Sequence, residues 1–251
     1  MKKGFSQEAL KLIACVTMLI DHFGYEIIYP LYRSVVRPEL VSQLRLFYYL
    51  CRSVGRIAFP IYAFLLAEGI RRTKDRKRYG TRLLISALLA EIPYDLMVSG
   101  GISGKYQSIM VTLLLGFFAL LAMEKCKDVA WKPVAAIPFA FMAELLNADY
   151  GWMGVAAVAL FELSRYTSGK TLVRFFGMLV LFHLKGGFLI QVGNFAIPLQ
   201  TLGALSMLFI GAYDGRKLTN SKAVQWGFYL FYPAHILLLW LGGLLLFKVI
   251  L

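Results

Sequence analysis

The stretch CVTMLIDHFGYEII, residues 15–28, decides the fold class, because Asp21, His22 and Glu26 stand among the apolar residues of a membrane-spanning helix. An aspartate at the centre of a bilayer costs about 2.5–3.5 kcal/mol on insertion scales. A chain that keeps such a residue is expected to turn it away from lipid, toward a partner or a water-filled cavity. The stretch therefore predicts a helix that spans a membrane and also helps to build a polar site.

The rest of the chain extends this prediction to an all-α, single-domain integral membrane bundle. Of the 251 residues 59% are hydrophobic, and they are spread from end to end, whereas soluble domains are about 45–50% apolar. A spanning helix needs about 20 mostly apolar residues, which predicts about nine spans, with a range of eight to ten. No cleavage site follows the first residues, so the first helix is expected to remain in the mature protein. The expected spans are 9–31, 44–70, 82–98, 108–123, 132–147, 151–167, 171–185, 195–213 and 224–247.

The placement of lysine and arginine predicts that the N-terminus lies in the cytoplasm and the C-terminus outside. Cytoplasmic loops of membrane proteins carry an excess of these residues. With alternating spans, the cytoplasmic ends hold Lys2, Lys3, Lys11, Arg71, Arg72, Lys74, Arg76, Lys77, Arg78, Arg82, Lys125, Lys127, Lys132, Arg165, Lys170, Arg174, Arg216, Lys217 and Lys222. The outer ends hold the shorter set Arg33, Arg37, Arg45, Lys105, Lys185 and Lys248.

The same charge pattern and the few cysteines argue against several other classes of protein. A net charge of +13 would suggest a nucleic-acid partner on a soluble chain. Here membrane topology and anionic lipid headgroups explain the charge, so the lipid bilayer is the expected partner and nucleic acid is not. Cys15, Cys51 and Cys126 are too scattered for a disulfide framework, and no CxxC or HExxH spacing predicts a metal site.

Two pairs of charged residues inside the expected spans have informative spacing. Arg52 and Arg56 are four residues apart and share a face of the second helix, as do Glu91 and Asp95 on the third. Pro93 lies between the two carboxylates and is expected to kink that helix. Because a short loop joins these helices, we expect them to be antiparallel neighbours. The four residues could form a structural network or also shape a polar active-site cavity.

His22 and His235 are the candidates for a proton acceptor inside the membrane. Asp21 and His22 are adjacent, so their side chains point about 100° apart and do not aim at the same point. Asp21 is expected to fix a neighbouring helix or to orient an imidazole from another span. His235 follows Pro233, where the last helix is expected to be kinked. Imidazole titrates near neutral pH, which suits either histidine to the role of base.

The densest positive charge lies in the loop RRTKDRKRYGTR, residues 71–82. It could serve only topology and lipid contact. Alternatively, its guanidinium groups suit a cytoplasmic docking site for a phosphate-rich ligand.

Several blocks of the sequence resemble the TraX family of conjugation-associated membrane proteins, in the family's order and over nearly the whole chain. They are ALKLIACVTMLIDHFG, GRIAFPIYAFLLAEGIRRTKDRKRY, LLISALLAEIPYDL, VTLLLG, ADYGWMGV and FYPAHILLL. The resemblance implies an acetyltransferase distantly like acyltransferase-3 proteins, with acetyl-CoA as the acyl donor. The acceptor would be an amine or hydroxyl of a protein N-terminus, sugar or small molecule.

The resemblance and the chemistry together suggest roles for the polar residues. The expected catalytic residues are His22, Asp21, Arg56, Glu91, Asp95 and His235. The residues expected to bind acetyl-CoA are Arg52, Glu68, Arg71, Arg72, Arg76 and Lys77. Buried ionisable residues also mark proton-coupled transporters, and a non-catalytic membrane scaffold is a third alternative. The sequence leaves the oligomeric state open.

Overall fold

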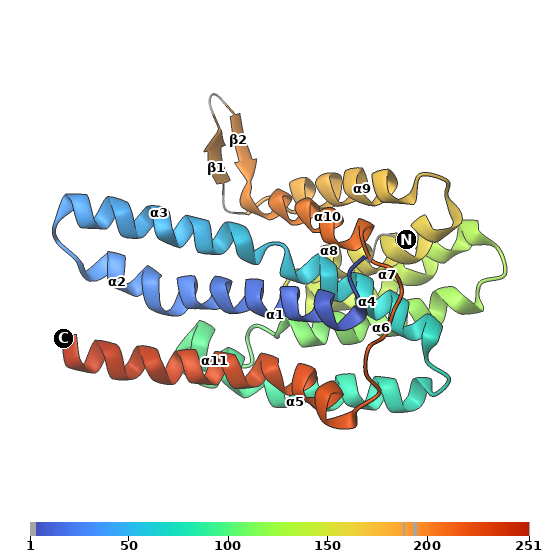
Figure 1. The fold of residues 1–251 in the computed structure, drawn as a ribbon, viewed down its shortest axis with the longest axis horizontal. Helices are drawn as coiled ribbons and strands as arrows, with labels where there is room; N and C mark the ends of the chain where they lie inside the picture. The colour runs from blue at the N-terminus through green and yellow to red at the C-terminus, as the bar shows by residue number, and fades with distance from the viewer. Residues whose placement is uncertain (1–3, 188, 193–194, 251) are drawn as a thin grey trace.

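The computed structural model describes residues 4–187, 189–192 and 195–250, and the positions of Lys2 and Lys3 lie outside these ranges. The described chain is a bundle of helices with one small β-hairpin (Figure 1). The expected all-α membrane class is therefore confirmed in its main feature, the helices.

The first helical rod contains the stretch with Asp21 and His22. It runs through α1 (Gln7–Phe23), a π-helical turn at Gly24–Ile28 and α2 (Tyr29–Ser34). Ser6 begins it, because its side chain accepts a hydrogen bond from the backbone N–H of Ala9. The wide π turn ends two residues before Pro30, whose ring nitrogen has no N–H to donate. The rod therefore widens at this point and continues.

A second rod lies beside the first and runs back along it. It consists of α3 (Pro38–Gly55) and α4 (Ala58–Arg72), with a break in the helix at Arg56 and Ile57. α3 and α4 both pack against α1. At the break, a Cβ on Gly55 would overlap the side chain of Asp21. Only glycine lets the backbone of the second rod come this close to Asp21 without moving either rod. Gly55 therefore allows the close contact between the two rods.

The remaining elements complete the bundle around these rods. The helices are α5 (Arg76–Ser99), α6 (Ile109–Lys125), α7 (Lys132–Leu145), α8 (Gly151–Leu163), α9 (Lys170–Lys185), α10 (Met207–Gly211) and α11 (Lys222–Ile250). Short 3₁₀ turns cover Val129–Trp131, Ser164–Tyr166 and Leu199–Ser206. The antiparallel hairpin pairs β1 (Leu189–Val192) with β2 (Phe195–Pro198), in a register that places Ile190 opposite Ile197.

Two expectations about the helices are wrong. The segment 195–213 is not one helix, because it begins as β2 and continues as a 3₁₀ turn and the short α10. Pro198 has no N–H for a helical ladder and ends the strand at this point. α5 does not pack mainly on α4; it packs against α11 and α6. The short loop therefore connects α4 and α5 without making them each other's main packing partners.

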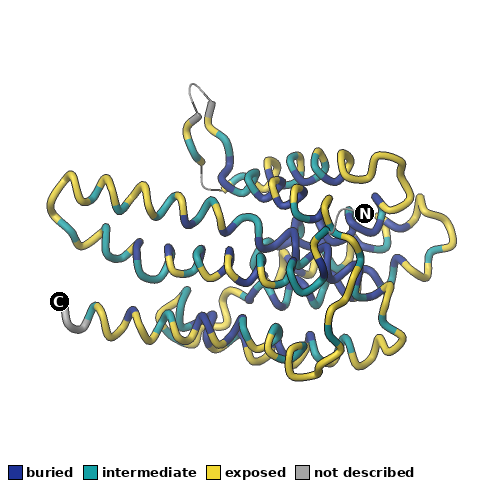
Figure 2. The backbone as a smooth tube through the Cα atoms, viewed as in Figure 1, coloured by how far each residue is buried: buried dark blue, intermediate teal, exposed yellow. Residues whose placement is uncertain are grey.

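Three helices in the described part of the chain are long and apolar enough to cross a membrane. They are Gln7–Ser34, Pro38–Arg72 and Lys222–Phe247. Exposed residues recur along the outer helices of the bundle (Figure 2). They include large apolar residues, for example Leu88 on α5 and Leu238 on α11. Exposed apolar residues in this number indicate contact with lipid or protein. These features identify a membrane protein, and the arrangement with nine spans stays a prediction.

The turns that carry most of the basic residues gather at one end of the molecule. The α4–α5, α6–α7 and α8–α9 turns lie at this end, together with the segment between α10 and α11 (Figure 1). The N-terminal segment joins them, since Phe5 pairs with Tyr213. We call this the basic end of the bundle. The bend between α2 and α3 and the C-terminus lie at the opposite end (Figure 1).

Candidate active site

Asp21 binds both arginines of the second rod. Its Oδ2 accepts a hydrogen bond of 2.7 Å from Arg52 Nη1, and its Oδ1 accepts one of 2.6 Å from Arg56 Nη2. Arg56 is held further by its own Nε, which donates to the carbonyl of Arg52, and by Nη1, which donates to Gln200 Oε1 at 2.8 Å. The prediction that the two arginines share one face is confirmed. Asp21 fixes a neighbouring helix, as expected for one of its two possible roles.

His22 points away from Asp21 and meets His235 of α11. Nδ1 of His22 lies 2.7 Å from Nε2 of His235, and the two ring planes are within 11° of parallel with centroids 4.9 Å apart. The centroid distance exceeds the nitrogen–nitrogen distance by about twice the distance from the centre of an imidazole ring to its nitrogen. The two rings therefore lie edge to edge in nearly one plane. The structure therefore brings together two histidines that are 213 positions apart in the chain.

The hydrogen bonds of this pair determine which nitrogen of His22 can accept a proton. Nδ1 of His235 lies 2.7 Å from the carbonyl oxygen of Phe231, which can only accept, so His235 carries its proton on Nδ1. In the neutral pair, Nε2 of His235 then accepts from Nδ1–H of His22. This leaves Nε2 of His22 with a free lone pair, the state that a general base requires.

A cavity of about 410 Å³ connects this centre with the basic end of the bundle. Asp21, His22, Arg52 and Arg56 line its inner part. Gln7, Lys11, Thr73, Lys217 and Gln225 line the part near the basic end. Since a helix rises 1.5 Å per residue, Gln7 and Asp21 are about 21 Å apart along α1. The cavity is thus an elongated passage between a positively charged mouth and a buried polar centre.

The loop before α8 adds a third group of polar residues to the inner part of the cavity. Asp149 and Tyr150 line it, and the backbone of Asn147 and Tyr150 has positive φ angles of 50° and 66°. The Thr112 hydroxyl donates to the carbonyl of Asp149, and the Tyr150 ring lies 4.0 Å from that of Phe59. Such backbone conformations are uncommon for residues other than glycine and often occur at functional sites. The block ADYGWMGV marks this loop in the sequence, but nothing in it singles out Asp149 or Tyr150.

Glu91 and Asp95 lie on α5 and do not bind the arginines. Glu91 accepts hydrogen bonds from the hydroxyl and the backbone N–H of Ser108. Asp95 accepts from the backbone N–H groups of Ser103 and Gly104. The interpretation of Glu91, Asp95 and the two arginines as one structural network is therefore wrong. Asp21 is the carboxylate that binds Arg52 and Arg56. The two carboxylates hold the loop between α5 and α6, and Tyr94 between them lines the cavity.

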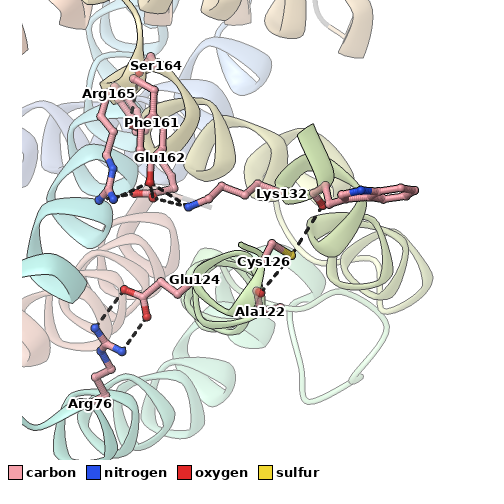
Figure 3. Close-up of polar contacts among 11 residues, drawn as sticks. Arg76, Ala122, Glu124, Cys126, Lys132, Phe161, Glu162, Ser164 and Arg165 are labelled. Atoms are coloured by element: carbon pink, nitrogen blue, oxygen red, sulfur yellow. Dashed lines mark hydrogen bonds and ion pairs between the residues drawn. The ribbon is translucent and has the colours of Figure 1, made fainter. Parts of the chain in front are cut away.

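Most residues expected to bind the acyl donor lie at the basic end but outside the cavity lining. Glu68 pairs with Arg71 and with Arg72, whose Nη1 also donates to the carbonyl of Gly215. Arg76 pairs with Glu124 of α6 at 2.7 Å (Figure 3). Two cations that were not expected at the site, Lys11 and Lys217, line the mouth of the cavity.

Groups that could hold a metal ion are absent from the part of the chain described here, since no three His, Cys, Asp or Glu side chains converge.

In the loop next to Lys217, Arg216 donates to Asp214 at 2.6 Å. This hydrogen bond holds the pKa of the Asp214 carboxyl below its usual value.

Comparison with known proteins connects this arrangement to a family. The model of the TraX protein family matches residues 6–242, which include every residue that lines the cavity. The chain belongs to the TraX family. It is also similar to the probable fimbrial assembly protein FimC, serogroup H1, of Dichelobacter nodosus, with 26% identity over 246 residues and 94% of each chain covered. No solved structure matches this TraX-family chain.

Proposed function

We propose that this TraX-family protein is a multi-pass acetyltransferase of the cytoplasmic membrane, with the N-terminus inside and the C-terminus outside. It would take an acetyl group from acetyl-CoA and transfer it to an amine or hydroxyl. The observation that carries the proposal is the elongated cavity, which joins a basic mouth to a histidine with a free ring nitrogen. That shape suits a long donor with phosphates at one end and a thioester at the other.

In the proposed reaction, Nε2 of His22 removes the proton of the acceptor nitrogen or oxygen. The acceptor atom forms a bond to the thioester carbonyl carbon, and the bond from that carbon to sulfur breaks. The proton then passes from His22 to the sulfur, so the products are the acetylated acceptor and CoA with a free thiol. His235 holds the His22 ring in the required tautomer throughout, because its Nδ1–H remains bonded to the carbonyl of Phe231.

Arg52 and Arg56 would stabilise the negative charge that develops on the thioester oxygen. Both line the cavity, and Asp21 holds them in place with hydrogen bonds of 2.7 and 2.6 Å. Fixed donors in a site that excludes water stabilise such charge more than mobile donors in solution do. In this role Asp21 positions the arginines.

The phosphates of acetyl-CoA would lie at the basic end. Lys11 and Lys217 line the mouth itself, and Arg82 lies over the rings of Tyr79 and Tyr229, which line the same passage. Arg71, Arg72, Arg76 and Lys77 stay predicted phosphate ligands. The three arginines among them would first have to separate from Glu68 and Glu124.

The acceptor is proposed to belong to a surface fibre. The similarity to a protein named for fimbrial assembly supports a pilus-related role. A fibre subunit offers an N-terminal amine and hydroxyl side chains, and either fits the reaction. Comparing the mass of fibre subunits from cells with and without the gene would reveal an acetyl group if this acceptor is right.

The direct test uses the purified protein with acetyl-CoA and measures the free thiol released in the presence of candidate acceptors. His22→Ala should lower transfer about 10²–10⁴-fold, the usual contribution of a general base. His183→Ala is the matched control, because His183 lies near the end of α9 and does not line the cavity. Activity that survives His22→Ala would contradict the proposal. Proton-coupled solute flux in liposomes, without acetyl transfer, would support the transporter alternative.

A further inference from the structure

A second group of buried charges lies at the basic end, on the face of α4 that is turned away from the cavity. Phe64 and Arg71 are seven positions apart and so share this face, whereas Tyr62, Leu66 and Gly69 line the cavity on the other face. Phe64 packs against Phe161 of α8 and against Tyr213, with ring centroids 5.5 and 5.3 Å apart. The group is therefore separate from the proposed acetyl-transfer centre.

The carboxylates of this group are already paired. Glu162 binds Lys132 at 3.5 Å and Arg165 at 3.2 Å, and the residues meet between α7 and α8 (Figure 3). Glu68 binds Arg71 and Arg72. Each carboxylate thus already has two cationic partners, so neither neutralises a further guanidinium.

Arg174 of α9 remains without a carboxylate among the residues that the structure describes. Only 8% of it is exposed. Its Nε donates to Ser164 Oγ at 2.8 Å, and its guanidinium lies 5.5 Å from the ring centroids of Phe64 and Phe161. The nearby charge that acts on it is another cation, Arg71. A buried cation without an anion is costly, so this position calls for an anion from outside the chain.

Tyr213 supplies an independent sign of a missing ligand. Its hydroxyl is buried and has no hydrogen-bond partner within the described chain. Its ring contacts Phe64, which stacks with Arg174, and lies 5.7 Å from the Arg72 guanidinium. Asp214 next to it does not serve as the anion, because Arg216 binds that carboxylate at 2.5 Å. A buried polar atom of this kind normally has a partner.

We propose that Arg174 and Tyr213 bind a phosphate group at the basic end of the bundle, next to Arg71, which stays paired with Glu68. Guanidinium groups match the oxygens of phosphate with parallel hydrogen bonds, and the tyrosine hydroxyl adds a further donor. Two sources offer this chemistry, the headgroup of an anionic lipid and a soluble phosphate compound.

The test measures phosphate binding to the full-length protein in two arms. Native mass spectrometry of protein from vesicles of phosphatidylglycerol and phosphatidylcholine tests the lipid source, and calorimetric titration with pyrophosphate tests the soluble source. In whichever arm binds, Arg174→Gln should weaken binding about tenfold or more, the effect of losing one charged hydrogen bond. Tyr213→Phe should weaken it less and decides the outcome if Arg174→Gln does not fold.

Lys170→Gln is the matched control, since it removes one exposed positive charge at the start of the same helix. It should leave both affinities within about twofold, because an exposed charge contributes little. The proposal is overturned if neither probe binds the wild type. It is also overturned if the site variants bind as Lys170→Gln does. Selective loss of phosphatidylglycerol would identify a lipid headgroup, and loss of pyrophosphate a soluble ligand.

Discussion

Asp21→Asn should destabilise the protein strongly, because it removes the carboxylate that both arginines of the second rod bind directly. Asp21 accepts charged hydrogen bonds of 2.7 Å from Arg52 and 2.6 Å from Arg56, and its side chain is only 9% exposed. Charged hydrogen bonds contribute about 1.5–3 kcal/mol each. Breaking a buried ion pair by removing one partner costs about 3–5 kcal/mol. We therefore expect a loss of about 3–5 kcal/mol in the free energy of unfolding.

Thermal unfolding in detergent micelles, followed by circular dichroism, measures this effect. For a chain of this size 1 kcal/mol shifts Tm by about 2–4 °C, so Asp21→Asn should lower Tm by about 6–20 °C. The matched control is Glu39→Gln, the same change at an exposed position in the first turn of α3. It should cost at most about 1 kcal/mol, through the helix dipole. A Tm for Asp21→Asn within about 2 °C of wild type would refute the reasoning.

The structure also ranks the two arginines. Arg56 binds Asp21, Gln200 and the carbonyl of Arg52 and is 12% exposed in its side chain, whereas the Arg52 side chain is 21% exposed. Arg56→Met should therefore lower Tm more than Arg52→Met. The opposite order would mean that the bonds to Gln200 and the backbone contribute nothing measurable.

Three further predictions use other features of the bundle. Single cysteines in intact cells should react with an impermeant reagent at position 250 and not at position 3, and the reverse labelling would overturn the proposed orientation. Gly55→Ala should cost about 1–3 kcal/mol, because the new methyl group overlaps Asp21, whereas Gly242→Ala, which meets nothing within 4 Å, should cost nothing. The double variant Lys11→Gln and Lys217→Gln should weaken acetyl-CoA binding, measured by calorimetry. The loss should exceed that of the double variant Arg71→Gln and Arg72→Gln. The opposite order would assign the phosphates of acetyl-CoA to the loop 71–82.

The sequence located the polar residues better than it located their partners. Spacing along one helix shows which residues share a face, so the prediction for Arg52 and Arg56 is confirmed. It does not show which other helix that face meets. Glu91 and Asp95 share a face too, yet α5 packs against α11 and α6, and their partners lie in the loop 103–108. Contacts between distant segments depend on the packing of the whole bundle.

Other parts of the site were missed because their signals are weak in a single sequence. In the sequence, Lys11 and Lys217 resemble the other basic residues that set membrane topology, and only the fold shows that they line one mouth. Tyr150 looks like an ordinary aromatic residue until its positive φ angle is known. The apolar segment 195–213 has the composition of a span, although Pro198 and the 3₁₀ turn divide it. Composition counts apolar residues, but it does not show where a regular hydrogen-bond ladder is interrupted.

The neighbouring Asp21 and His22 can now be understood as two separate connections made by one helix. Successive side chains on a helix point about 100° apart. Asp21 accordingly faces the arginines of the second rod, and His22 faces His235 of α11. Both oxygens of Asp21 are occupied by arginines, so the partner that orients His22 is His235. The proposed base is therefore assembled where α1 meets α11, and the arginines of the proposed site are held where α1 meets the second rod. Any change that separates α11 from α1 should remove the tautomer control of His22 while leaving the Asp21 cluster intact.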